Sequence, residues 1–110
     1  MIFTATQLDD AWLIDLEPRE DEPHLAIATG EAIHGVLDRH GVTLSRLLHG
    51  EGRPAWPVLE AALAHGDDIR IGFEDTLLLP DGSHARSNAD LVDEAVRIVR
   101  ARGSEPAHVR

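Results

Sequence analysis

The 110-residue sequence contains no cysteine and no lysine, so all ten of its basic residues are arginine. Without cysteine, the chain cannot form disulfides, thiolate zinc sites, iron–sulfur clusters or a cysteine nucleophile. It also has no HxH or HExxH pair of histidines, so a complete zinc site cannot be predicted from it. The 20 acidic residues give a net charge of −10. The chain is therefore a poor candidate for binding nucleic acid or anionic membranes, because both require clustered positive charge.

Long apolar runs are absent as well. The first six residues contain no basic residue, and Gln7 soon interrupts the apolar stretch, so no signal peptide is expected. No window approaches the roughly 18 apolar residues of a membrane span. We therefore expect a soluble, cytoplasmic protein. Its 43% apolar and 27% charged residues are ordinary for a folded chain, and its length corresponds to one small domain or a piece of a larger one.

From about residue 11 onward, short apolar runs alternate with longer amphipathic stretches. Three strands are predicted, over residues 12–16, 44–48 and 69–73. Three helices are predicted, over residues 24–40, 54–65 and from the capping-box-like Ser87 to about residue 102. In the first helix, Leu25, Ala28 and Ala32 are expected to form a buried stripe, which Ile33, Val36 and Leu37 continue. This β–α order predicts an α/β fold with a parallel sheet.

The domain organisation that follows is simple. Residues 1–10 form an unassigned N-terminal segment, residues 11–103 hold the three βα units, and residues 104–110 form a tail. Trp12 and Trp56 are expected to be packing residues.

Polar side chains follow each predicted strand, where the functional groups of parallel α/β folds collect. They are Asp15 and Glu17 after the first strand, His49 and Glu51 after the second, and Glu74 and Asp75 after the third. Alternation places Arg70 and Glu74 on one face of the third strand and Ile69 on the other. An arginine and a glutamate on a buried face are costly without partners, so this group is either a structural ion pair or part of a site. His49 is either a satisfied loop histidine or a site residue.

The block DIRIGFEDTL at residues 68–77 is distinctive, as are LPDG at 79–82 and SNADLV at 87–92. Together they resemble the C-terminal segment of the β-keto acid cleavage enzymes, the family of the 3-keto-5-aminohexanoate cleavage enzyme. Weaker similarity is present in LEP at residues 16–18, LLHGEG at 47–52 and AWPVL at 55–59. The resemblance covers roughly residues 12–102.

The resemblance implies a (β/α)8 TIM barrel with a divalent metal, usually zinc, at the C-terminal face. It implies a reaction of a β-keto acid with acetyl-CoA that yields acetoacetate and a new acyl-CoA. In the matching positions, Glu74 is implied as a metal ligand, and Arg70 and Asp75 as the catalytic pair. Asp75 would be the general base and Arg70 would hold it ionised and oriented. His49 is predicted as a substrate-binding residue.

The chain also departs from the family pattern. It lacks the family's histidine pair, and 110 residues are well short of the about 250 of a typical barrel. Three units would leave two open sheet edges, so self-association or a partner chain is expected. We expect the isolated chain to be inactive in keto acid cleavage. Two alternatives remain: a non-catalytic α/β fragment or subunit that completes a barrel with a partner, and an unrelated small ligand-binding domain.

Overall fold

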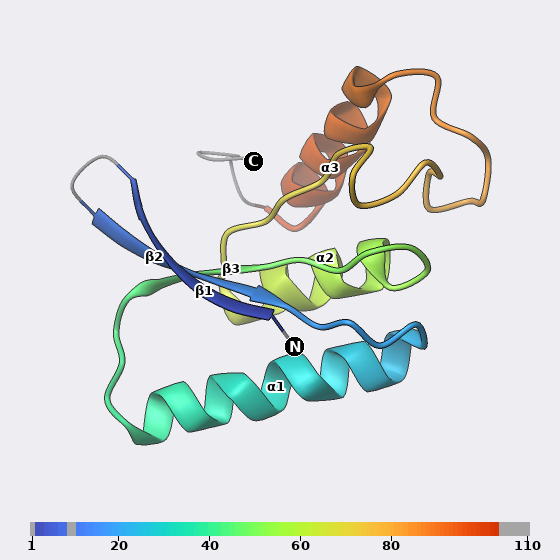
Figure 1. Cartoon of the computed structure of the whole chain (residues 1–110). Helices are drawn as coiled ribbons and strands as arrows, with labels where there is room; N and C mark the ends of the chain where they lie inside the picture. Colours follow the sequence, from blue (N-terminus) through green and yellow to red (C-terminus); the bar gives the residue numbers. More distant parts are fainter. Residues whose placement is uncertain (1, 9–10, 104–110) are drawn as a thin grey trace.

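The computed structural model describes residues 2–8 and 11–103, and its described part is a small sheet covered by helices (Figure 1). The elements in chain order are β1 (Ile2–Leu8), β2 (Ala11–Glu17), α1 (Pro23–Arg39), β3 (Ser45–Leu48), α2 (Ala55–His65) and α3 (Asn88–Ala101). The sheet order is β1-β2-β3. The first two predicted strands and all three predicted helices are therefore confirmed, with ends that differ by only one or two residues.

The sheet combines one parallel and one antiparallel pair. β2 and β3 are parallel, in a register that places Leu13 opposite Ser45 and Leu16 opposite Leu48, as the βα order predicts. β1 lies antiparallel on the other side of β2. The sequence analysis left this segment unassigned, and β1, not β2, is therefore the edge strand on this side of the sheet.

The third predicted strand, residues 69–73, does not form. Only an isolated parallel bridge joins Leu47 to Asp68. The backbone N–H of Asp68 donates to Arg46 at 2.8 Å, and the N–H of Leu48 donates to Asp68 at 3.3 Å. The pairing then stops because β3 ends at Leu48 and the chain turns at Gly72. The α/β class is confirmed, with two parallel strands in place of three, and the described residues do not close a barrel.

The helix ends follow local rules. The Ser87 hydroxyl accepts a hydrogen bond from the Asp90 N–H at the start of α3, as the capping pattern predicts. Gly66 ends α2 in the left-handed conformation, with φ of 77°. At the start of α1, the Glu22 carboxylate accepts from the Leu25 N–H at 3.0 Å.

The main core lies between the sheet and the helices. One continuous cluster contains apolar side chains from β2, β3, the three helices and the segment after Asp68. It includes Ile14, Leu16, Ala26, Leu37, Leu48, Val58, Leu59, Ile69, Ile71, Leu91 and Val99. Trp56 is buried in this cluster, as predicted, whereas Trp12 is 50% exposed, so its predicted packing role is wrong.

The buried face of α1 differs from the predicted stripe. The prediction is wrong at its start, where Leu25, Ala28 and Ala32 are exposed, and at Val36, but it is confirmed at the buried Leu37 and the partly buried Ile33. The other residues that face inward are Ala26, Gly30 and His34. The reason is close packing at Gly30, where a Cβ atom would stand 3.3 Å from a methyl group of Leu48. A helix approaches a sheet most closely where its contact residue is small, so the glycine and not the leucine faces the sheet.

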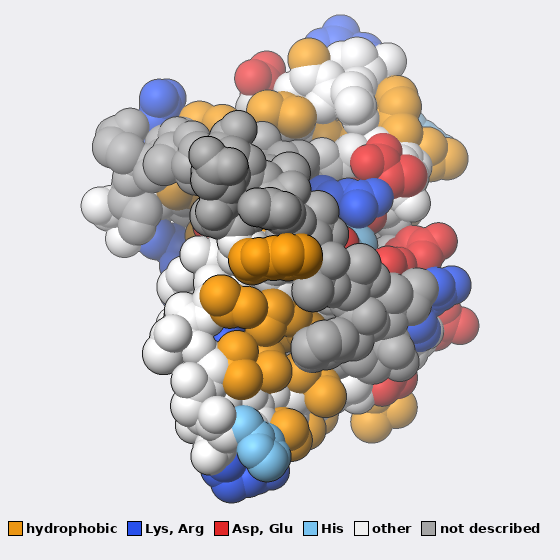
Figure 2. Space-filling model, turned by 60° about the vertical axis from the view of Figure 1, so that its left-hand side comes forward, with side chains coloured by type: hydrophobic (Ala, Val, Ile, Leu, Met, Phe, Trp, Pro, Cys, Tyr) orange, Lys and Arg blue, Asp and Glu red, His pale blue; other side chains and the backbone are white. Residues whose placement is uncertain are grey.

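Some large apolar side chains of the described chain stay in contact with solvent. They are Trp12, Leu25, Val36, Leu44, Phe73, Leu77 and Leu78. Figure 2 shows a group of hydrophobic side chains on the face that is turned toward the viewer. Within the described residues, no helix combines the length and the apolar character needed to cross a membrane.

A buried histidine–aspartate pair joins α1 to the segment that follows α2. His34 Nε2 lies 2.6 Å from Asp67 Oδ2, and His34 Nδ1 lies 2.8 Å from the carbonyl oxygen of Gly30. Both ring nitrogens therefore face acceptors. Two protons must lie along these two contacts, either both on the imidazole or one on His34 Nδ1 and one on the Asp67 carboxyl. Burial raises the pKa of Asp67, although the nearby His34 opposes this shift.

We expect the His34–Asp67 pair to stabilise the fold most strongly in acid. The pKa of Asp67 is higher in the folded chain than in the unfolded chain. The contribution of its protonated carboxyl to the free energy of unfolding is therefore present below about pH 4 and is lost as the pH rises through the raised pKa. The difference in unfolding free energy between wild type and Asp67→Asn should therefore fall with rising pH. Denaturant titrations at several pH values measure it. Asp93→Asn, an exposed change on α3, serves as the control, and a pH-independent difference for Asp67→Asn would contradict the expectation.

Candidate functional site

The site lies on the face of the sheet opposite the main core, which we call the charged face. Ile14, Leu16 and Leu48 point into the core, so their sequence neighbours point the other way. The charged face consists of Asp15 and Glu17 from β2, His49 directly after β3, and Arg70 from the segment that runs beside β3. The predicted alternation around Arg70 is confirmed, because Ile69 and Ile71 are both in the core cluster.

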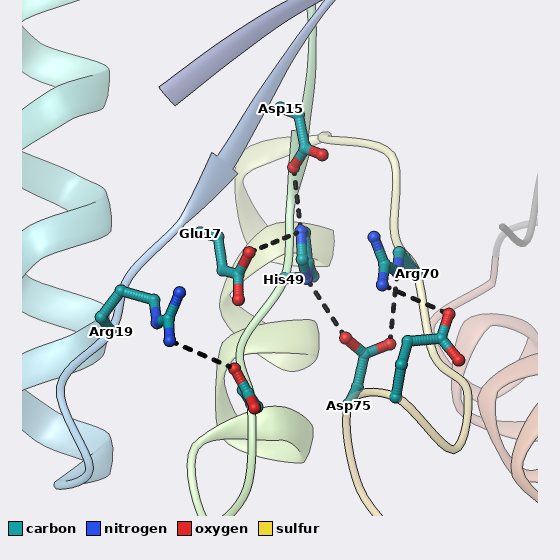
Figure 3. Close-up of polar contacts among 8 residues, drawn as sticks. Asp15, Glu17, Arg19, His49, Arg70 and Asp75 are labelled. Carbon is teal, nitrogen blue, oxygen red and sulfur yellow. Dashed lines mark hydrogen bonds and ion pairs between the residues drawn. The ribbon is translucent and has the colours of Figure 1, made fainter. Parts of the chain in front are cut away.

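His49 is at the centre of the charged face (Figure 3). Its side chain is only 2% exposed. On one side, Nε2 lies 2.9 Å from Asp15 Oδ1 and 3.9 Å from Glu17 Oε2. On the other side, Nδ1 lies 3.4 Å from Asp75 Oδ1. Three carboxylates from two distant segments thus surround one imidazole ring.

The charge on His49 follows from these neighbours. Burial by itself would lower the pKa of His49, but the Asp75 and Asp15 carboxylates outweigh burial and the opposing Arg70 charge, so the pKa is raised. A protonated imidazole carries a proton on each ring nitrogen and can face acceptors on both sides. The arrangement favours the cationic form of His49.

Asp75 and Arg70 form the second half of the cluster. Arg70 Nε lies 3.4 Å from Asp75 Oδ2, and Arg70 Nη2 donates to Glu74 Oε1 at 3.2 Å. The side chain of Asp75 is 2% exposed, whereas that of Glu74 is 61% exposed. Asp75 therefore has a cation at each oxygen, His49 at one and Arg70 at the other. The structure brings together the predicted residues His49, Arg70, Glu74 and Asp75.

Asp15 and Glu17 were identified in the sequence as strand-end carboxylates but were not assigned to a site. Their place beside His49 depends on the parallel pairing of β2 with β3, in which His49 N–H donates to the Leu16 carbonyl at 3.1 Å. The signal that could have identified them is alternation, because both residues occupy the face of β2 opposite Ile14 and Leu16. Glu51 was also predicted to follow a strand, and its carboxylate lies 3.9 Å from the guanidinium group of Arg19.

Glu74 is the predicted metal ligand, and its carboxylate lies over Gly72. A Cβ atom at position 72 would come within 2.8 Å of Glu74 Oε2, so the glycine leaves room for this side chain. Zinc in proteins usually has three or four protein ligands. Within the described residues, no group of three or more His, Cys, Asp or Glu side chains is arranged to hold a metal ion. The described residues therefore do not fit a zinc ion by themselves, and Glu74 can supply at most one ligand of a larger set.

A cavity of about 800 Å³ adjoins the site, between the start of α2 and the loop that follows Asp75. Trp56, Phe73, Leu77 and Leu78 make its walls mainly apolar, and Glu74 and Asp75 also line it. The Trp56 indole N–H donates to the Leu78 carbonyl at 2.8 Å and ties the loop to α2. His49 is not among the lining residues of this cavity, so its assignment as a substrate-binding residue stays a prediction.

Comparison with known proteins finds two kinds of similarity. Residues 25–110 match the sequence model of a family described as beta-keto acid cleavage enzyme. Two curated proteins, both named 3-keto-5-aminohexanoate cleavage enzyme, are each 36% identical to part of the chain. The protein from Fusobacterium nucleatum subsp. nucleatum matches over 58 residues, 53% of this chain and 21% of its own length. The protein from Acetoanaerobium sticklandii matches over 52 residues, 47% of this chain and 19% of its own length. The chain thus spans about a fifth of these relatives.

Asp75 should matter far more to stability than its neighbour Glu74. Asp75→Ala leaves two cations, one of them the buried His49, without their shared partner, a loss of about 3–5 kcal/mol by analogy with broken buried pairs. Glu74→Ala removes a mostly exposed partner and should change stability by no more than about 0.5 kcal/mol. Urea titration of both variants measures the difference. Equal effects of the two substitutions would mean that the cluster around Asp75 does not hold the fold together.

Proposed function

The chain belongs to the β-keto acid cleavage enzyme family, and from that premise we propose that it is the part of such an enzyme that carries the Arg70–Asp75 catalytic pair. The observation that carries this proposal is the burial of Asp75 between Arg70 and His49, at the end of the parallel segments. Functional groups of α/β folds collect at the carboxyl ends of parallel strands. A carboxylate fixed there, beside a cavity, has the position that a general base requires.

In the proposed reaction, Asp75 accepts a proton from the β-keto acid, and Arg70 keeps the carboxylate ionised and oriented. The substrates are a β-keto acid and acetyl-CoA, and the products are an acyl-CoA and acetoacetate. The cavity beside Asp75 is the candidate place for substrate, because its walls are mainly apolar and Glu74 and Asp75 are among its lining residues. Glu74 is the candidate for one metal ligand, with the remaining ligands supplied from outside the described residues.

The alternative function is a non-catalytic piece that completes a barrel with a partner chain or a second copy. It is favoured by the lack of a metal-binding group among the described residues. It is also favoured by the open sheet of the described residues, because an open sheet edge can accept a strand from another chain.

The decisive test measures zinc content and acetoacetate formation on the same samples. We expect the purified chain alone to hold no zinc tightly in native mass spectrometry and to form no acetoacetate from a β-keto acid and acetyl-CoA. In a complex with the chain that supplies the missing ligands, we expect one zinc per site and measurable acetoacetate. Glu74→Ala should then reduce the zinc content, whereas Glu60→Ala, an exposed change on α2, should not.

Each outcome decides between the two functions. Acetoacetate formation by the chain alone would refute the view that its site is incomplete. A stable complex with neither zinc nor activity would favour the non-catalytic alternative. If Glu74→Ala leaves the zinc content of an active complex unchanged, the assignment of Glu74 as a metal ligand is wrong. The role of Asp75 is then tested separately, by measuring acetoacetate formation in the Asp75→Asn variant.

A further inference from the structure

His49 has two carboxylate partners on opposite sides of its ring. Nε2 lies 2.9 Å from Asp15 Oδ1 and Nδ1 lies 3.4 Å from Asp75 Oδ1, as ion-pair contacts without aligned hydrogen bonds. The first partner comes from β2 and the second from the turn after the Leu47–Asp68 bridge. His49 is therefore the link between the β2 carboxylates and Asp75.

The backbone around Asp75 is also fixed. Its N–H donates to the Gly72 carbonyl at 2.9 Å, and its carbonyl accepts from the Gly52 N–H at 2.7 Å. The side chain is then held at both oxygens, with His49 near Oδ1 and Arg70 near Oδ2. Only the orientation of the carboxylate plane depends on these two cations, because the backbone is already anchored.

The two cations are not equivalent. The Arg70 side chain is 30% exposed and is shared with Glu74, whereas His49 is 2% exposed and has only carboxylates at its nitrogens. Without a charge on His49, Asp15, Glu17 and Asp75 would face one another around a neutral ring. A buried imidazolium lies next to all three and offsets part of their charge, while Arg70 adds a second positive charge at Asp75.

We propose that His49 is a positioning residue for Asp75: Asp15 and Glu17 hold the imidazole at Nε2, and its Nδ1 fixes one oxygen of the Asp75 carboxylate. This inference rests on the proposed function, in which Asp75 is the base. It assigns to His49 a role behind the base and not a contact with substrate, in agreement with its burial and its absence from the cavity lining.

Nuclear magnetic resonance of the full 110-residue chain, with ¹⁵N-labelled histidine, tests the geometry directly. At neutral pH, both ring nitrogens of His49 should carry a proton. Asp75→Asn should shift the Nδ1 signal more than the Nε2 signal, and Asp15→Asn should do the reverse. The signals of His84, an exposed loop residue, serve as the internal control. The proposal would be overturned if only one ring nitrogen of His49 carries a proton in wild type. It would also be overturned if Asp75→Asn leaves the ¹⁵N chemical shifts of His49 unchanged. The wild-type measurement stands even if a variant fails to fold.

A kinetic readout separates positioning from substrate binding. In the active complex of the proposed function, His49→Gln should lower kcat roughly tenfold to a hundredfold and leave KM for the β-keto acid within about twofold. A raised KM with unchanged kcat would instead make His49 a substrate ligand and refute the positioning role. If the wild-type complex forms no acetoacetate, the proposed function fails, and the imidazole spectrum still decides whether His49 holds Asp75.

Discussion

All helices contribute their buried side chains to a core on one face of the sheet, and this constraint determines the character of the other face. Because strand side chains alternate, every apolar residue directed into the core places its neighbour on the charged face. That face carries carboxylates from β2, His49 after β3 and Arg70 after the bridge. Buried charges of one sign are unfavourable, so the two cations and three carboxylates must compensate one another. The candidate site is therefore also a structural requirement of the fold.

The part of the site that could be predicted from sequence is the part that is local. Arg70, Glu74 and Asp75 lie within six positions of one another, so one turn brings them together and a short motif contains them. The contact of His49 with Asp15 is different, because it exists only through the parallel register that sets Leu16 opposite Leu48. Periodicity predicts that two strands exist, but not which residues stand opposite each other. For this reason Asp15 and Glu17 could be identified as strand-end residues and not as partners of His49.

The distinction between local and long-range contacts also explains where the predicted fold was wrong. The ends of the helices depend on nearby caps, such as Ser87 and Gly66, and they agree with the predictions. The inward face of α1 depends on the residues against which the helix packs. Because Gly30 packs against Leu48, the buried face of the helix differs from the predicted one. β1 forms against an available edge of β2, whereas no described strand pairs with residues 70–73. Strands depend on neighbours more than helices do, since a strand makes its ladder hydrogen bonds with another segment and a helix makes them within itself.

Two buried histidines show how the opposite ends of the sheet differ. His34 is at the end where the segment containing Asp67 enters, and both of its nitrogens have well-formed contacts, at 2.8 and 2.6 Å. His49 is at the end where β3 leaves the sheet, and neither of its nitrogens has an aligned hydrogen-bond partner among the described residues. Asp75 Oδ2 is in the same condition, close to Arg70 but not aligned with it. Buried polar atoms without aligned partners are costly, and folds keep few of them. His34 is thus held by aligned hydrogen bonds, whereas His49 and its carboxylate neighbours are held by attraction between opposite charges.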